Sequence, residues 1–237
     1  MAIKSFRRIE KKFVINQYQR DELLKTVYQH MDLDPYCLNE ATYKIQNIYL
    51  DTDNNTLISH SIRKPRYKEK LRLRKYTGMD KVFFEIKKKI NGIVGKRRVL
   101  LSMEDVNKLL EGKENPTGKT YIDQQIIGEI AYILSNYKCY PKVYISYDRL
   151  GFFDKNDLEF RLTIDDHIYS SRENLNFDQD THGPYLLQDG YYLLEIKSCR
   201  NFPLWLVNKL TELNIHSKTF SKYGTEYKNY LKEQEDL

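Results

Sequence analysis

The sequence predicts an α+β protein whose sheet is an eight-stranded antiparallel β-barrel with helices packed on the outside. Two observations carry this prediction. Strand-like segments with a period of two dominate the chain, and several of them are joined by short turns. Helical segments lie between or after these strands, and each strand has one apolar face on which a helix can pack.

The expected strands come from alternating apolar and polar residues. Asn91-Gly92 joins two of them and is a strong hairpin signal, because both residues tolerate a positive φ. The segment around Asp154–Asp157 is rich in turn residues and joins two more. The expected strands are residues 5–15, 43–51, 67–77, 81–90, 93–101, 141–152, 157–166 and 190–199.

The expected helices come from apolar residues at helical spacing and from capping signals. Ser102 precedes Glu104 and Asp105, which suits an N-cap followed by an acidic first turn. Asn201 precedes Pro203, which predicts a second capped helix. Its apolar face consists of Leu204, Leu206, Val207 and Leu210. The expected helices are residues 17–31, 103–112, 121–136, 202–213 and 223–234.

Composition indicates one globular domain over residues 1–237, with 41% hydrophobic and 30% charged residues. There is no apolar run of about 20 residues that could cross a bilayer and no secretory signal, so we expect a cytoplasmic protein. The cysteines and histidines lack metal-ligand spacing, which favours reduced thiols and packing roles. The net charge of +6 suits nucleic acid, phosphates or simple solubility.

The polar faces of the expected strands are strongly charged. In YKEKLRLRKY (67–76), Leu71 and Leu73 occupy one face. The other face carries Lys68, Lys70, Arg72 and Arg74. The same parity recurs in the segments 7–13, 81–89, 157–165 and 192–197.

Two interpretations of these charged faces compete. Each could be a solvated outer face above an apolar core. If helices instead cover the apolar faces, the charged faces point into the barrel, where unpaired charges are costly. The lumen would then hold water and a polyanion. Its minority carboxylates, Glu10, Glu85, Asp165 and Glu195, are candidates for holding Mg²⁺ or Mn²⁺. Glu10 and Glu85 could instead be ion-pair partners of the cations.

Nine short motifs resemble, in order, those of VTC domains, which belong to the triphosphate tunnel metalloenzymes together with the CYTH-type triphosphatases. The resemblance runs from about residue 7 to residue 230. The motifs are RRIEKKF, NIYLDT, KLRLRKY, FFEIKKK, GKRR, YDR, EFRLTID, LLEIK and FSKYG.

The resemblance implies a triphosphate tunnel fold and a polyphosphate polymerase that transfers the γ-phosphoryl group of ATP to polyphosphate, releases ADP and uses Mn²⁺ or Mg²⁺. The implied metal ligand is Glu195, with Glu10 as a second candidate. The expected phosphate-binding set is Lys12, Lys70, Arg72, Arg74, Lys87, Lys96, Arg98, Arg149, Arg161, Lys197, Ser221 and Lys222, with Lys70 included by its strand parity. Those expected to act in catalysis are Arg72, Arg74, Lys87, Arg149, Arg161 and Lys222.

The first strand departs from the CYTH pattern. CYTH triphosphatases begin with E-x-E-x-K, whereas this chain has Arg8, Glu10 and Lys12. The missing carboxylate removes a ligand for a second metal that would activate water. This departure weakens hydrolysis and favours transfer to a phosphate acceptor.

Two other functions remain open at this stage. One is an inorganic or nucleoside triphosphatase on the same fold, and the other is a non-catalytic module that binds polyphosphate or RNA. The 20 tyrosines could stack bases, yet most occupy apolar positions of helices and strands, so we expect ATP and polyphosphate rather than nucleic acid. With no membrane segment in the sequence, any export would need a separate membrane partner.

Overall fold

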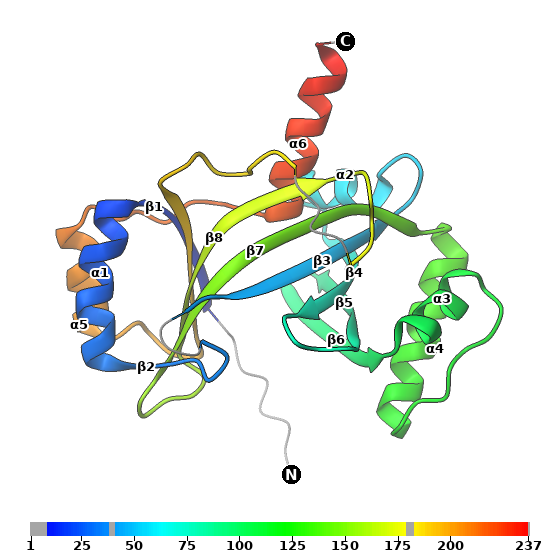
Figure 1. Ribbon diagram of the computed structural model, residues 1–237, viewed down its shortest axis with the longest axis horizontal. Helices are drawn as coiled ribbons and strands as arrows, with labels where there is room; N and C mark the ends of the chain where they lie inside the picture. Colours follow the sequence, from blue (N-terminus) through cyan, green and yellow to red (C-terminus); the bar gives the residue numbers. More distant parts are fainter. Residues whose placement is uncertain (1–8, 38–40, 179–182, 237) are drawn as a thin grey trace. The chain divides into compact units, whose positions relative to one another are not determined.

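The computed structural model describes residues 9–37, 41–178 and 183–236, and within them it contains nine strands and six helices (Figure 1). The strands are β1 (Ile9–Asn16), β2 (Met31–Leu33), β3 (Tyr43–Asp51), β4 (Tyr67–Tyr76), β5 (Val82–Ile90), β6 (Ile93–Leu101), β7 (Tyr140–Asp154), β8 (Arg161–Ser171) and β9 (Tyr191–Ser198). The helices are α1 (Gln17–His30), α2 (Thr56–Ile62), α3 (Met103–Leu110), α4 (Tyr121–Tyr137), α5 (Leu204–Glu212) and α6 (Lys222–Glu235).

The strands follow the order β1-β9-β8-β7-β3-β4-β5-β6, and β2 pairs with β7. This path of eight strands confirms the predicted number. β1 and β6 are its two ends among the described residues. The expected residues 5–8 of the first strand lie outside the described residues. The three-residue β2 and the seven-residue α2 were not predicted, because both are too short to show a clear period.

Both predicted turns are present. In the β5–β6 hairpin, Asn91 and Gly92 have φ values of +48° and +89°, and Ile90 pairs with Ile93. In the β7–β8 turn, Asp154 Oδ1 accepts hydrogen bonds from the backbone N–H groups of Asn156 and Asp157. Local side-chain chemistry therefore fixes these two connections.

Two local predictions were wrong. β8 begins at Arg161 and not at residue 157, because residues 157–160 belong to the turn, and Leu158 is 71% exposed. Asn201 does not cap α5. The N-cap is Pro203, whose backbone carbonyl accepts the first helical hydrogen bonds. A residue directly before a proline is disfavoured in helical conformation, so the helix begins after Pro203 and not at residue 202. Ser102 does cap α3, since its side chain accepts from the N–H of Asp105.

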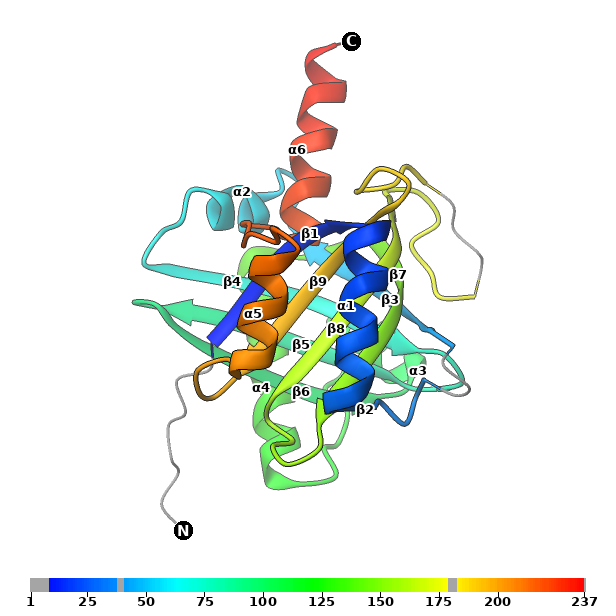
Figure 2. The ribbon, with the colours of Figure 1, turned by 90° about the vertical axis from the view of Figure 1, so that its left-hand side faces the viewer.

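The chain divides into two compact units, and β3, β7 and β8 contribute residues to both. Unit 1 consists of residues 1–44, 147–168 and 187–220. Its core joins the apolar faces of β1, β8 and β9 to α1 and α5, which lie side by side over these strands (Figure 2). The fully buried residues of this core include Ile15, Leu23, Leu162, Leu194 and Leu206.

Unit 2 consists of residues 45–146, 169–186 and 221–237. Its core joins the apolar faces of β3–β6 to α2, α3 and α4, and α4 lies along β6 (Figure 1). Leu71 and Leu73 are 0% and 1% exposed and belong to this core, as predicted. Helices therefore cover the apolar strand faces in each unit, and the charged faces lie on the other side of the strands.

The described helices include none with the length and apolar character needed to cross a membrane. Cys37, Cys139 and Cys199 are free thiols in the structure.

Candidate functional site

The charged face of unit 2 is built on β4, β5 and β6, whose antiparallel register places polar residues in rows across the three strands. Side chains at alternate positions point to the same face, so the rows lie one beside another along the strands. The first two rows are Arg72–Glu85–Arg98 and Lys70–Lys87–Lys96.

Glu85 is the buried counterion of this face. Its side chain is 2% exposed, and its Oε2 lies 2.6 Å from both Nε and Nη2 of Arg72. Lys96 Nζ lies 2.6 Å from Oε1, and Arg74 Nε lies 3.9 Å from Oε2. Burial raises the pKa of Glu85, but the cations of Arg72, Arg74 and Lys96 outweigh it and hold that pKa well below its ordinary value. Glu85 is thus an ion-pair partner that orients cations, one of the two roles considered for it.

Lys96 is a partly buried cation of this face whose pKa is lowered. Burial lowers its pKa to about 8, and Arg72 and Arg74 act in the same direction, while Glu85 opposes them. The side chain keeps 41% of its surface exposed, so a ligand can reach it. Lys96 faces the same side as Glu85. Arg97 bonds Glu129 of α4 instead, which confirms the predicted strand parity.

Arg72 and Arg74 are held from β3 as well. Arg72 Nη1 donates to Tyr49 Oη at 3.2 Å, and Arg74 Nε donates to Asn47 Oδ1 at 2.9 Å. Asn47 in turn donates to the carbonyl of Ile145. Sequence reasoning missed Asn47 and Tyr49, although their alternate positions within NIYLDT carried the necessary signal.

The first turn of α6 adjoins this face. Lys70 Nζ lies 3.4 Å from Ser221 Oγ, and Ser221 caps α6 by accepting from the N–H of Gly224. Lys222 is 8% exposed in the same turn. The Tyr223 ring stacks on Tyr49, which places α6 against β3.

Tyr223 also donates a hydrogen bond to a carboxylate on β3. The acceptor is Asp51 Oδ2, at 2.9 Å. Asp51 also accepts the N–H groups of Leu57 and Ile58 at the start of α2, so one carboxylate ties both helices to β3. Burial, followed by the Asp51 charge, raises the pKa of Tyr223 far above its ordinary value, so it remains a hydrogen-bond donor.

The charged face of unit 1 alternates carboxylates and lysines on β1 and β9. Lys12 is directly opposite Glu195, and Glu10 is directly opposite Lys197. Lys12 Nζ lies 3.0 Å from Glu195 and 3.5 Å from Glu10, and Lys197 Nζ lies 3.4 Å from Glu195. Glu195 is 5% exposed. These four side chains form one ion-pair group.

Arg149 and Arg161 lie in different surroundings within unit 1. Arg149 forms a two-point ion pair with Asp165, at 2.6 Å and 2.8 Å. Burial opposes the charge of Arg149, yet Asp165 raises its pKa, so it stays a cation. Arg161 is directly opposite Lys197, but its Nε donates to the carbonyl of Leu158. Asp165 is therefore the ion-pair partner of Arg149, which argues against a role as metal ligand.

The described residues contain no cluster of three or more His, Cys, Asp or Glu side chains that could hold a metal ion. The unit 1 face nevertheless offers oxygen donors. Glu195 is directly opposite Thr163, whose Oγ1 is buried with no hydrogen-bond partner in the structure. Because Mg²⁺ is commonly held by one or two carboxylates plus substrate phosphates, Glu195, Glu10 and Thr163 fit a divalent ion that a bound phosphate also coordinates.

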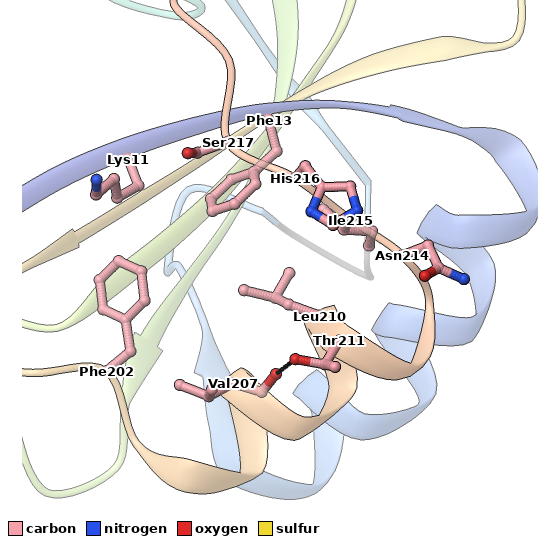
Figure 3. A pocket seen from close by; sticks show the side chains of 10 residues that line it. All are labelled: Lys11, Phe13, Phe202, Val207, Leu210, Thr211, Asn214, Ile215, His216 and Ser217. Carbon is pink, nitrogen blue, oxygen red and sulfur yellow. Dashed lines mark hydrogen bonds between the residues drawn. The ribbon is translucent and has the colours of Figure 1, made fainter.

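A groove of about 310 Å³ lies on the opposite side of β1, over α5 and the loop that follows it (Figure 3). Its lining includes Phe13, Phe202 and Leu210, which are apolar. Lys11 and Phe13 have the opposite strand parity to Glu10 and Lys12. The groove is therefore separate from the charged face of unit 1.

The cations of both charged faces have the chemistry that phosphate oxygens require. Arginine suits two-point contacts with phosphate oxygens, and lysine supplies a point charge. Lysines directly opposite one another, as in the row Lys70–Lys87–Lys96, repel each other across the sheet. A bound polyanion would remove this repulsion.

Comparison with solved structures identifies the fold. The chain is similar to a proposed adenylate cyclase from Bacillus halodurans, with 15% identity, a TM-score of 0.52 and coverage of 90% of this chain and 93% of that one. It is also similar to a Hippeastrum protein described as a proposed adenylyl cyclase with dominant triphosphatase activity, with 15% identity, a TM-score of 0.54 and coverage of 94% and 96%. A search of curated proteins found no match.

The sheet thus has a triphosphate-tunnel-like fold, which it shares with these two solved structures. More particularly, the model of the VTC domain family matches residues 7–231, and the chain belongs to that family.

Removal of the buried counterion should destabilise unit 2. We expect Glu85→Gln to lower the free energy of unfolding by about 3 kcal/mol, because Arg72, Arg74 and Lys96 then repel one another without a counterion. Urea denaturation measures this change. The control is Glu104→Gln, which removes an exposed pair with Lys108 and should change the free energy of unfolding far less. Equal effects of the two substitutions would contradict the role of Glu85.

The lowered pKa of Lys96 leads us to expect that anion binding depends on pH. Because its pKa is lowered to about 8 in the free protein, Lys96 is charged below that pH and loses its charge as pH rises through it. A bound polyanion favours the charged form, so the affinity for tripolyphosphate should fall above pH 8, and binding there should take up a proton.

Titration calorimetry in buffers of different ionisation enthalpy measures that proton. The Lys96→Arg variant keeps its charge and should bind without the pH step. A step of unchanged size in this variant would show that another group causes it.

Proposed function

We propose that this protein is a polyphosphate polymerase that transfers the γ-phosphoryl group of ATP to the end of an inorganic polyphosphate chain and releases ADP. The observation that best supports this proposal is the cationic face of unit 2. It presents rows of lysine and arginine over one buried carboxylate, Glu85, which leaves a net positive charge for phosphates to neutralise. Membership of the VTC domain family supports the same substrate class.

The proposed reaction needs positioning and charge stabilisation more than a covalent catalyst. A terminal oxygen of polyphosphate attacks the γ-phosphorus, the bond to the bridging β,γ-oxygen breaks, and ADP leaves with that electron pair. The acceptor oxygen is already anionic, so no strong base is required. Arg72 and Arg74, held by Glu85, Tyr49 and Asn47, would contact the phosphates without reorganising.

The other cations of the proposed site supplement this role. On the face of unit 2, Lys87, Lys96 and Arg98 would bind phosphate oxygens, and Lys70, Ser221 and Lys222 would do so beside the first turn of α6. On the face of unit 1, we assign phosphate binding to Lys12, Arg149, Arg161 and Lys197.

For the metal, we propose Glu195, with Glu10 and Thr163 beside it on the face of unit 1. A bound Mn²⁺ or Mg²⁺ would neutralise charge on the transferred phosphoryl group. Lys12 and Lys197 flank Glu195 and keep its carboxylate oriented when no phosphate is present.

A triphosphatase is the second candidate, because the Hippeastrum protein of similar fold has a dominant triphosphatase activity. The two functions share the binding face and differ in the acceptor, which is water in one and phosphate in the other. Arg8, at the place of the first carboxylate of E-x-E-x-K, favours the polymerase, although it lies outside the described residues.

The proposal also includes the location and the partners of the protein. We propose that it is cytoplasmic, that any export of the product needs a separate membrane partner, and that nucleic acid is not a ligand.

Product analysis tests the function. With ATP and Mn²⁺, the protein should form ladders of long phosphate chains on a gel, and release of orthophosphate alone would favour the triphosphatase. Arg72→Ala and Arg74→Ala should each lower the rate by about a hundredfold. Arg97→Ala, on β6 but directed at α4, is the matched control and should keep most of the activity. If Arg97→Ala and Arg72→Ala behaved alike, the assignment of the face would be wrong.

Metal binding tests Glu195 independently of turnover. In the presence of tripolyphosphate, Glu195→Gln should weaken Mn²⁺ binding by more than about tenfold, because the substitution removes an anionic ligand. Electron paramagnetic resonance of free Mn²⁺ measures this. Glu22→Gln, which changes a partly exposed carboxylate of α1 outside the proposed site, should leave the Mn²⁺ affinity as it is. An equal affinity in Glu195→Gln would remove that residue from the proposed site.

A further inference from the structure

The cationic face of unit 2 continues for one more row beyond Lys70–Lys87–Lys96. Lys68 on β4 is directly opposite Lys89 on β5, and both have the strand parity of the preceding rows. On β6 the corresponding residue is Val94, which is 51% exposed. This row contains no carboxylate, in contrast to the row of Glu85.

A third lysine approaches this row from the segment after α2. Lys68 Nζ donates to the carbonyl of Ser61, in the last turn of α2, and Lys64 follows that helix with a φ of +55°. Burial lowers the pKa of Lys68, and the charges of Lys89 and Lys64 lower it further. Lys68 is therefore the lysine that both neighbours, Lys89 across the strand pair and Lys64 after α2, repel.

Such a cluster of like charges destabilises the folded protein unless a ligand neutralises it. Like charges directly opposite each other destabilise a strand pair. Lysines that protect a sheet edge from aggregation are expected on edge strands, yet β4 and β5 are both interior to the path, with a strand on each side. Protection of a sheet edge thus does not explain Lys68 and Lys89, whereas binding of an anionic ligand would explain them.

The rows also form a continuous track. Successive rows are two residues apart along the strands, which is roughly 7 Å. The row of Arg72, the row of Lys70 and the row of Lys68 follow one another without an intervening apolar row. A short phosphate ligand would occupy the first two rows, and a longer chain would extend to the third.

We propose that Lys64, Lys68 and Lys89 form an extension site that binds the distal part of a long inorganic polyphosphate chain whose end lies among Arg72, Lys87 and Lys96. This inference rests on the proposed function, because it takes the same face to be the phosphate-binding site. It adds a ligand preference, in which affinity increases with chain length beyond three phosphates.

The test compares two ligands and two variants at equal ionic strength. We expect Lys68→Gln/Lys89→Gln to weaken the binding of long-chain polyphosphate by about five- to tenfold relative to the wild type. Its affinity for tripolyphosphate should change less than twofold relative to the control. The control is Lys119→Gln/Lys138→Gln, which removes the same charge from exposed positions of unit 2.

Several results would overturn the extension site. They are an equal loss for both ligands, an equal loss in the control, or a wild type that binds tripolyphosphate and long chains equally well. A single-stranded RNA of matched charge serves as a third ligand, and an equal, Lys68- and Lys89-dependent affinity for it would show an unspecific polyanion surface.

These binding measurements need no turnover. Suppose that the protein makes no polyphosphate, yet prefers long chains and loses this preference only in Lys68→Gln/Lys89→Gln. This result would support the extension site and count against the polymerase. If instead ladders form but long chains are not preferred, the result would support the polymerase and count against the extension site.

Discussion

The buried carboxylate of Glu85 is the interaction on which the cationic face of unit 2 depends. Arg72 and Lys96 each lie 2.6 Å from it, with Arg74 at 3.9 Å, in a position with almost no solvent. One carboxylate cannot neutralise three cations, so the face keeps an excess of positive charge. This excess makes the face suitable for a polyanion, and the fixed geometry around Glu85 means that little reorganisation accompanies binding.

Support for this face comes from the strands and helices that border it. Asn47 and Tyr49 on β3 hold the guanidinium groups from one side. Asp51, two residues further along the same strand, ties α2 and Tyr223 of α6 to β3, and thereby sets the first turn of α6 beside Lys70. Apolar residues of the opposite parity pack under α3 and α4. The two sides of each strand thus serve different purposes, one for stability and one for ligand binding.

Much of this arrangement could be predicted from sequence, because a strand has a period of two. Parity alone separated Leu71 from Arg72 and Arg97 from Lys96, and the structure confirmed both assignments. Parity says nothing about partners. Glu85 and Asp165 could not be distinguished as metal ligands or counterions until their contacts with Arg72 and Arg149 were known. Short elements such as β2 and α2 were missed, and the start of β8 was misplaced because a turn took over its first residues.

A crystal structure with a non-hydrolysable ATP analogue and Mn²⁺ tests the central claim most directly. The account predicts that phosphate oxygens of the analogue lie within hydrogen-bond distance of Arg72, Lys87 and Lys96, with Glu85 still paired beneath them. Phosphates bound only elsewhere, with these three side chains in contact with water alone, would contradict it and would return the charged face of unit 2 to the role of a solvated surface.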